Sequence, residues 1–339
     1  MTLVLRENDV RELLPPAAMP EVMRTLEAAF RRQGDGETRN QPRTRIVPPD
    51  RSGVMHTLPA YTPGEPGHPE ADGPGLIGLK TYTTFAGGVR FVVLLSSAAD
   101  GRLLAIIEAD WLGQMRTGGA SGVATRHMAS DEARVVGVIG AGGQARTQLI
   151  AMCAARPIET IHVAARDAAR GEAFCAEMRQ TLGVNVQLAA NAEDAVRGAD
   201  IVVTATTARA PVLDGAWLRP GTHLNLMGSN WADRREVDDE AVMRSERIAV
   251  DAFDQALIEA GDLLIPARAG KLDLAQARAQ GRIVELGEIV AGKTAGRPTA
   301  QAITLFKSLG IGLEDVAVGG LVYALARERG LGEEIRLFE

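Results

Sequence analysis

The sequence predicts an α/β protein in which a doubly wound parallel sheet is joined to a second, α+β domain. From about residue 134 to about residue 297, short apolar runs alternate with helical stretches, as in a parallel sheet with right-handed crossovers. Upstream of this region, strand-like runs follow one another closely with Gly/Pro turns between them, which indicates a largely antiparallel sheet. The chain has 339 residues, enough for two domains.

The strands of the predicted parallel sheet are short runs rich in apolar and β-branched residues. We expect them at 135–139, 160–164, 184–188, 200–206, 222–227 and 247–251. Helical stretches lie between most of these runs, at 144–154, 167–182, 191–198 and 237–244. This alternation is typical of consecutive β-α-β units.

The N-terminal part has a different pattern. Helices are expected at 8–14 and 19–33, strands at 44–47, 54–58, 76–82, 90–95 and 103–107, and a further helix at 111–128. Residues 63–74 are rich in Pro, Gly and acidic side chains, which predicts a loop able to cover a substrate pocket. The stretch from Ile303 onward has a helical pattern and is expected to return to the first domain. The predicted domains are therefore 1–125 with 304–339, and 126–303.

Composition excludes several classes of protein. The net charge is −6 and the basic residues are dispersed, so no nucleic-acid partner is indicated. No apolar run approaches the roughly 18 residues of a membrane span, and the first residues lack a signal-peptide pattern. Cys153 and Cys175 have no His or Cys neighbours at metal-ligand spacing, so neither a metal site nor a disulfide is expected. A cytoplasmic location fits these features.

The most informative motif is the glycine turn Gly140-Ala141-Gly142-Gly143-Gln144-Ala145. It follows an apolar strand and opens a helix, which is the context that a G-x-G-x-x-A dinucleotide fingerprint requires. Gly140 permits the tight turn, Gly142 lets a pyrophosphate approach the backbone, and Ala145 lets the helix pack against the strand. The alternative is a glycine turn that binds nothing. The strand before it and the helix after it favour a Rossmann-type domain.

The end of the next strand bears on the choice of nicotinamide dinucleotide. In NAD-selective folds an acidic residue there binds the ribose 2′-hydroxyl, about twenty residues after the glycines. Ala165 occupies that position here and Arg166 follows, and an arginine can pair with a 2′-phosphate. NADP(H) is therefore favoured. Asp167 keeps NAD(H) open, because a shift of one residue would bring its carboxylate to the ribose, although it could equally be a helix N-cap.

Five segments, in order along the chain, resemble motifs of the ornithine cyclodeaminase/mu-crystallin family. The matches extend from about Gln41 to about Tyr323. The segments are Met115-Arg116-Thr117-Gly118-Gly119-Ala120-Ser121, the glycine turn 140–145, Ala199-Asp200-Ile201-Val202-Val203-Thr204-Ala205-Thr206, Arg219-Pro220-Gly221-Thr222-His223-Leu224-Asn225 and Thr304-Leu305-Phe306-Lys307-Ser308-Leu309-Gly310.

The resemblance implies a Rossmann domain and a dimerisation and substrate domain built from both ends of the chain. It also implies a cytoplasmic homodimer with a nicotinamide dinucleotide and a small amino- or imino-acid substrate. Members of the family include ornithine and lysine cyclodeaminases, alanine dehydrogenases and ketimine reductases. A fold transfers between relatives more safely than a substrate does.

The resemblance also suggests roles for individual residues. Lys80 matches the family's catalytic lysine, and a buried lysine of lowered pKa can act as a general acid or base. Arg116 matches the arginine that holds the substrate carboxylate, and Thr117 beside it would contact the cofactor phosphates. A second arginine of the family falls on either Arg43 or Arg45, which the sequence does not separate.

Four further positions are expected on the cofactor side. Ala205 and Thr206 end the fourth strand of the parallel sheet, and Met227 ends the fifth. Ser308 matches a family residue near the nicotinamide. Open α/β sheets bind ligands at the carboxyl ends of their strands, which is where these residues are expected.

Asn230 departs from the family pattern. Cyclodeaminases and several alanine dehydrogenases have an aspartate at this position, whereas an amide cannot take up a proton at neutral pH. Asp233 is a weak substitute, and Trp231 could narrow the substrate pocket. We therefore expect an imine (ketimine) reductase or amino-acid dehydrogenase, in which Asn230 orients a group. A cyclodeaminase and a non-catalytic ligand binder resembling mu-crystallin remain the alternatives.

Overall fold

The computed structural model describes residues 1–64 and 75–337, and the chain divides into two compact units. Unit 1 comprises Met1–Arg116 and Gly310–Glu339, and unit 2 comprises Thr117–Leu309. The boundaries predicted from the sequence are 125/126 and 303/304. Of the loop predicted at 63–74, residues 65–74 lie outside the described part of the chain.

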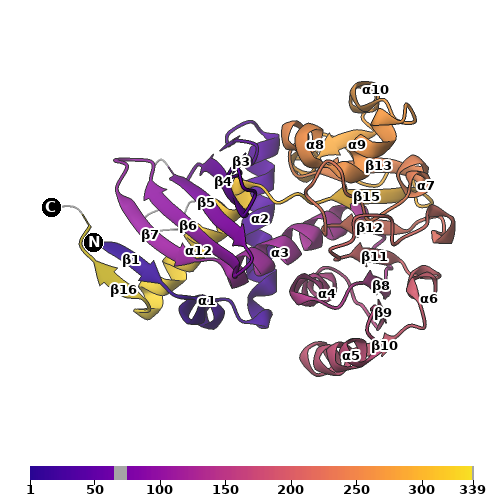
Figure 1. The fold of residues 1–339 in the computed structure, drawn as a ribbon, viewed down its shortest axis with the longest axis horizontal. Coiled ribbons are helices and arrows are strands. Elements are labelled where there is room, and N and C mark those ends of the chain that lie inside the picture. The colour runs from indigo at the N-terminus through magenta and orange to yellow at the C-terminus, as the bar shows by residue number, and fades with distance from the viewer. Residues whose placement is uncertain (65–74, 338–339) are drawn as a thin grey trace. The chain divides into compact units, whose positions relative to one another are not determined.

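Unit 1 is built on a mixed sheet of eight described strands (Figure 1). Their order is β16-β1-β7-β6-β5-β4-β2, and β3 also pairs with β4. As predicted, the strands from β3 to β7 pair antiparallel. β1, β2 and β16 were not predicted; β2 and β16 pair antiparallel with β4 and β1, and β1 runs parallel to β7. The bounds are β1 Thr2–Leu5, β2 Arg39–Asn40, β3 Thr44–Ile46, β4 Gly53–Thr62, β5 Leu76–Phe85, β6 Gly88–Ser97, β7 Leu103–Glu108 and β16 Glu333–Ile335.

One face of this sheet is covered by helix α12 (Gly312–Arg329), yellow in Figure 1, which packs on β4, β5 and β6 and against α2 (Met19–Gly34). Almost every residue of the first three turns of α12 is buried. The other unit 1 elements are α1 (Glu7–Leu13) and the 3₁₀ turn η1 (Pro16–Ala18). Helix α3 (Asp110–Met128) begins in unit 1, and the boundary between the units falls inside it.

Unit 2 contains the predicted parallel sheet, with eight described strands in the order β10-β9-β8-β11-β12-β15-β13-β14. Every strand pair in it is parallel, so the expected fold class is confirmed. The bounds are β8 Val135–Ile139, β9 Thr160–Ala164, β10 Asn185–Leu188, β11 Ile201–Thr204, β12 His223–Leu226, β13 Ser245–Val250, β14 Ile283–Glu285 and β15 Ile303–Lys307.

Crossover segments connect these strands, and most of them contain helices. Asp167 caps α5 by accepting a hydrogen bond from the Arg170 N–H, and Gly183 ends that helix in the left-handed conformation. The bounds are α4 Gly143–Ala155, α5 Ala168–Leu182, α6 Ala192–Val196, η2 Gly215–Trp217, α7 Asp239–Arg244, α8 Phe253–Glu259, α9 Gly261–Arg268, α10 Leu274–Ala279 and α11 Leu286–Val290.

The expectation of helix from Ile303 onward was wrong for its first residues. Ile303–Lys307 forms β15, which lies between β12 and β13 with all five residues buried. A strand buried on both faces is a continuous apolar run, which periodicity does not distinguish from a buried helix. Helix begins only after Gly310 and Gly312, and β16 follows α12.

The strand order reverses between β8 and β11, which are neighbours although β9 and β10 lie between them in sequence. β9 and β10 extend the sheet on one side of β8, and β11 and β12 extend it on the other. Ligands of open α/β sheets bind at this switch point, beyond the carboxyl ends of the strands.

Among the described residues, none of the helices combines the length and the apolar character that a membrane span requires.

A buried histidine in β12 makes the fold sensitive to acid. His223 is fully buried, its Nδ1 lies 2.9 Å from Thr304 Oγ1, and burial lowers its pKa from 6.5 to about 3. His223 is protonated below about pH 6.5 in the unfolded chain but only below about pH 3 in the folded chain, so stability is lost as the pH falls through that window.

Between about pH 7 and about pH 5 we expect His223 to lower the free energy of unfolding by about 2 kcal/mol. Urea unfolding over this pH range measures the change in the free energy of unfolding. In His223→Asn this free energy should depend less steeply on pH. A variant with the same pH dependence as the parent would contradict the role given to His223.

Candidate active site

The predicted phosphate turn has the geometry that dinucleotide binding requires. Gly140 follows β8 with φ +117°, and a Cβ added there would lie 2.3 Å from the Ala205 carbonyl oxygen. Only glycine fits that approach. Gly142 is the N-cap of α4, and a Cβ added to it would meet no atom within 4 Å, so the space beside its backbone is open. Ala145 is fully buried, as expected for close packing of helix on strand.

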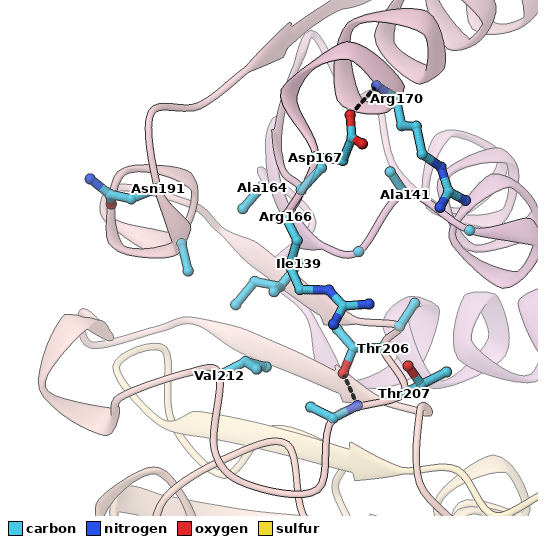
Figure 2. Close-up of a pocket in the computed structure, with 16 residues that line it drawn as sticks. Ile139, Ala141, Ala164, Arg166, Asp167, Arg170, Asn191, Thr206, Thr207 and Val212 are labelled. Carbon is cyan, nitrogen blue, oxygen red and sulfur yellow. Dashed lines mark hydrogen bonds between the residues drawn. The ribbon is translucent and has the colours of Figure 1, made fainter.

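A pocket of about 550 Å³ opens at this turn (Figure 2). It lies where the ends of β8, β9 and β11 meet, which is the switch point of the sheet. The pocket therefore joins predicted residues from three separate strand ends. The lining includes Gly140, Ala141, Gly142, Arg166, Asp167, Ala205 and Thr206, which the sequence analysis named, and Arg170, Asn191, Thr207 and Val212, which it missed.

Two arginines mark the end of the pocket at β9. Arg166 and Arg170 both line it and are exposed, and Arg166 points across the cavity towards Thr206 in Figure 2. The Asp167 carboxylate accepts the Arg170 N–H at 2.9 Å, so one of its oxygens is used as the N-cap of α5. The sequence signal that could have identified Arg170 is its spacing, four residues after Arg166.

The remaining cofactor candidates lie elsewhere in unit 2, outside the lining of this pocket. Gly143 and Gln144 begin α4, and the buried Thr117 accepts a hydrogen bond on its carbonyl from Gln148 Nε2 at 3.1 Å. Met227 follows β12 and is half-buried. Ser308 follows β15, and its hydroxyl lies 3.4 Å from Asp251 Oδ2.

A buried carboxylate that sequence reasoning missed fastens the loops after β11 and β12. Glu236 accepts the backbone N–H of Thr206 at 2.8 Å and that of Gly228 at 2.7 Å, and the hydroxyls of Thr204 and Thr206. Burial raises its pKa, and nearby Lys307 opposes that shift. Glu236 thus holds the backbone of one pocket loop against its neighbour.

Asn230 lies on the loop after β12 and is half-buried. The preceding residue is held by a buried lysine, since Lys307 Nζ donates to the Ser229 carbonyl at 2.6 Å and pairs with Asp262 at 3.0 Å. After it, the Arg234 guanidinium lies over the Trp231 ring at 5.1 Å. The loop that carries the departure from the family pattern is therefore anchored.

A second group of predicted residues meets inside unit 1. Lys80 on β5 points to the face that α12 covers, and it is buried. Its Nζ lies 3.2 Å from Asp315 Oδ1 and 5.1 Å from the centroid of the Phe91 ring. Burial, the largest cause, and the charge of Arg116 lower the pKa of Lys80 to about 8, and Asp315 opposes them. A lysine with this pKa exchanges a proton near neutral pH.

The two arginines beside Lys80 are held by different groups. Arg116 donates from Nε to Asp315 at 2.9 Å and from Nη1 to Glu314 at 2.7 Å, so its charge is balanced by carboxylates. Arg43 donates to the Tyr82 hydroxyl at 2.6 Å and to the Gly310 carbonyl at 3.0 Å, which are both neutral acceptors. Both guanidinium groups are thus fixed near the Lys80 amine.

Cross-strand register explains the aromatic side chains around these cations. His56, Tyr82 and Phe91 lie opposite one another on β4, β5 and β6, and Lys80 is two residues from Tyr82 on the same face. The His56 and Tyr82 rings stack at 4.2 Å. Burial and the two arginines 43 and 45 lower the pKa of His56 to about 4, so the ring is neutral at pH 7.

The structure places the two arginines that the sequence left unresolved in different positions. Arg43 precedes β3 and is buried beside Tyr82, in the group that contains Lys80. Arg45 lies on β3 opposite His56 and is half-buried. Both lie close enough to His56 to lower its pKa.

Glu314 and Asp315 are the acidic members of this group, and sequence reasoning missed both. They lie in the first turn of α12 and are almost completely buried. A signal was present, because these two acids open a helix whose neighbouring residues are apolar on every side. Buried carboxylates need cationic partners, so such a pair predicts an ion-pair network.

The chain is similar to known proteins over most of its length. A model of the ornithine cyclodeaminase/mu-crystallin family matches residues 2–330. The Delta(1)-pyrroline-2-carboxylate reductase of a Bacillus cereus strain is 35% identical over 272 residues, which cover 78% of this chain and 82% of that protein.

Two solved structures are similar over almost their whole length. One is the Delta(1)-pyrroline-2-carboxylate reductase of Thermococcus litoralis in complex with NADH and L-proline, with a TM-score of 0.89, 35% identity and coverage of 98% of this chain and 100% of that one. The other is an archaeal alanine dehydrogenase dimer with bound NAD, with a TM-score of 0.88, 28% identity and 99% coverage of both chains. The fold, the glycine turn and the match over residues 2–330 together show that this chain belongs to the ornithine cyclodeaminase/mu-crystallin family.

Proposed function

We propose that this protein reduces the C=N bond of a small 2-imino acid to the corresponding amino acid with a nicotinamide dinucleotide, and catalyses the reverse oxidation. The observation that carries the proposal is the buried lysine of lowered pKa among arginines in unit 1. The dinucleotide pocket in unit 2 and the similarity to imine reductases support it.

The residues of unit 1 supply the parts of the reaction that need charge. Arg43, and Arg116 within its ion pairs, attract the substrate carboxylate, since guanidinium groups suit carboxylate geometry. The Lys80 ammonium gives a proton to the imine nitrogen, so that an N–H bond forms on the substrate as one on Lys80 breaks. Lys80 then regains a proton from solvent. A reduced nicotinamide dinucleotide, when bound, supplies the hydride that the imine carbon accepts.

The first substrate to test is a cyclic imino acid with an apolar ring, such as Δ1-pyrroline-2-carboxylate. Two of the relatives compared above act, by their names, on this compound. The rings of Tyr82 and Phe91 lie beside Lys80 and present an apolar surface. His56 is neutral, so none of these three rings offers the negative charge that an ornithine side-chain ammonium would require.

We favour imine reduction over cyclodeamination because of Asn230. Loss of ammonia from a diamino acid requires a group that takes up a proton from the amine, and an amide does not do so. Reduction of an existing imine needs only a hydride, a proton donor and a carboxylate site. In that reaction Asn230 would orient a group through hydrogen bonds.

For the cofactor we propose NADPH in preference to NADH. Arg166 and Arg170 both line the pocket at the end of β9, and two guanidinium groups suit a 2′-phosphate. Asp167, the residue that would favour NADH, accepts a hydrogen bond as the N-cap of α5. The neighbouring structures contain NADH or NAD, so they support a nicotinamide dinucleotide and leave this preference to be tested.

We also propose a cytoplasmic homodimer that associates through the outer face of the unit 1 sheet. Cys153 and Cys175 are thiols, which suits a reducing compartment. Apolar side chains on the face opposite α12 are exposed, and a large exposed apolar patch is typical of an interface. They are Ile46, Met55, Ile77 and Phe85.

The role of Lys80 is tested by Lys80→Met. We expect the rate of NADPH oxidation with Δ1-pyrroline-2-carboxylate to fall by about 10²- to 10⁴-fold, the usual contribution of a proton donor. NADPH binding, measured by fluorescence, should stay within about twofold, because the pocket lies in unit 2. The exposed Lys271→Met is the matched control. Ammonia release from ornithine by the parent, without imine reduction, would instead indicate the cyclodeaminase.

The cofactor preference is tested by Arg166→Ala. A lost charge-assisted contact of about 1.5–3 kcal/mol corresponds to a KM for NADPH raised by about 10- to 100-fold. The KM for NADH should change little, and Arg197→Ala, another exposed arginine of unit 2, should alter neither. Equal effects of Arg166→Ala on both cofactors would contradict the 2′-phosphate assignment.

The homodimer is tested by placing charge on the outer face. Light scattering should give the mass of two chains for the parent and of one chain for the double variant Met55→Glu/Ile77→Glu. The control is Leu257→Glu, an exposed apolar residue on α8 that should leave the mass unchanged. A parent that is monomeric at micromolar concentration would exclude the proposal.

A further inference from the structure

One short segment of unit 1, Gly310–Asp315, contacts all three buried cations of the site. Its first carbonyl accepts a hydrogen bond from Arg43, and its two acids bind Arg116 and Lys80. None of the contacts between this segment and the cations was predicted from the sequence. The segment follows β15 and includes the start of α12, with Glu314 and Asp315 in the first helical turn.

Within this segment, Asp315 differs from the other residues because one of its oxygens contacts both Lys80 and Arg116. Oδ1 lies 3.2 Å from Lys80 Nζ and 2.9 Å from Arg116 Nε. The carboxylate is fully buried. Two cations held by the same oxygen attract it and repel each other, so the oxygen holds them close together and favours the charged form of Lys80.

We propose that Asp315 is the positioning residue of this enzyme, which holds the Lys80 amine beside Arg116 and keeps it protonated for transfer to the substrate nitrogen. The proton transfer to the substrate rests on the proposed function. The contacts of Asp315 with Lys80 and Arg116 do not, because the structure shows them.

The charges around Lys80 explain why a counter-ion is needed. Arg116 from α3 and Arg43 from the segment before β3 both lower the pKa of Lys80, in addition to burial. Asp315 from α12 raises it, through both its charge and its hydrogen bond. The rings of Tyr82 and Phe91, within 5.8 Å of Nζ, favour the cation only weakly. Without Asp315, Lys80 would lose its proton at a lower pH.

Glu314 has a different partner, although it is the next residue. It pairs with Nη1 of Arg116 at 2.7 Å, whereas the largest carboxylate effect on the pKa of Lys80 comes from Asp315. Gly310 completes the arrangement. It has φ +72°, and a Cβ added there would lie 2.4 Å from Arg116 Nη1, so a side chain at this position would displace the guanidinium.

The test is the pH dependence of Lys80 in Asp315→Asn, which preserves shape and removes the charge. Reduction needs the ammonium form of Lys80, so kcat/KM falls as the pH rises through its pKa, which is about 8 in the parent. In the variant this fall should begin at least about one pH unit lower. The kcat/KM of the variant should therefore be about tenfold below that of the parent above pH 8, and closer to it near pH 6. NADPH binding should be unchanged. Asp110→Asn, an exposed acid in the first turn of α3, is the matched control and should keep the parent profile.

A second measurement does not require turnover. Trace acetylation of Lys80 with acetic anhydride at several pH values, followed by peptide mass spectrometry, reports the pKa of its amine whether or not the proposed substrate is correct. A parent that shows no imine reduction, with a lowered Lys80 pKa in Asp315→Asn, would reject the proposed function and retain the role of Asp315. Equal titration of Lys80 in the parent and in Asp315→Asn would overturn that role.

Asp315→Glu separates charge from position, and it replaces Asp315→Asn if the latter does not fold. Its carboxylate should keep the Lys80 titration within about half a pH unit of the parent, while the longer side chain disturbs Arg116 and raises the KM for the imino acid. A titration displaced by more than about one pH unit in Asp315→Glu would also overturn the proposal.

Discussion

The buried cations of unit 1 depend on the pairing of charge. Lys80, Arg43 and Arg116 are removed from water, which is costly unless opposite charges or hydrogen-bond acceptors replace the lost hydration. Glu314, Asp315 and the Gly310 carbonyl provide this replacement from a single turn. Burial and Arg116 lower the pKa of Lys80 from 10.5 to about 8, and Asp315 limits that fall, so the amine suits proton transfer.

The same constraint shapes the chain around the cations. Acidic residues are favourable at a helix N-terminus, so opening α12 with Glu314 and Asp315 stabilises the helix and balances the cations at once. The turn before it needs glycine at position 310, both for its positive φ and because the Arg116 guanidinium occupies the space of a side chain. The β4–β5–β6 register then places the rings of His56, Tyr82 and Phe91 in one row beside Lys80.

In unit 2 the requirement is different: the glycine turn leaves open space for phosphates, while the neighbouring loops are fixed in place. Gly140 lets the turn approach the end of β11, and Gly142 leaves open space beside the backbone. Glu236 then fixes the loops after β11 and β12 through backbone N–H groups, so that the pocket wall is held by a buried carboxylate. The pocket is therefore preformed around its lining residues, which favours binding because little ordering remains to be done.

The sequence by itself determined the parallel sheet, the dinucleotide turn and the family, because strand–turn–helix patterns and ordered motifs are local features of the chain. It also suggested Lys80 and Arg116 as site residues, but only through the resemblance, since an isolated lysine on a strand carries no local signal. The tertiary structure decided that Ile303–Lys307 is a strand, because burial on both faces hides the period that separates strand from helix. It also placed Arg43 rather than Arg45 beside Tyr82, and it brought Asp315 to Lys80 across 235 residues of sequence. Contacts between residues so far apart are set by packing, and no local pattern encodes them.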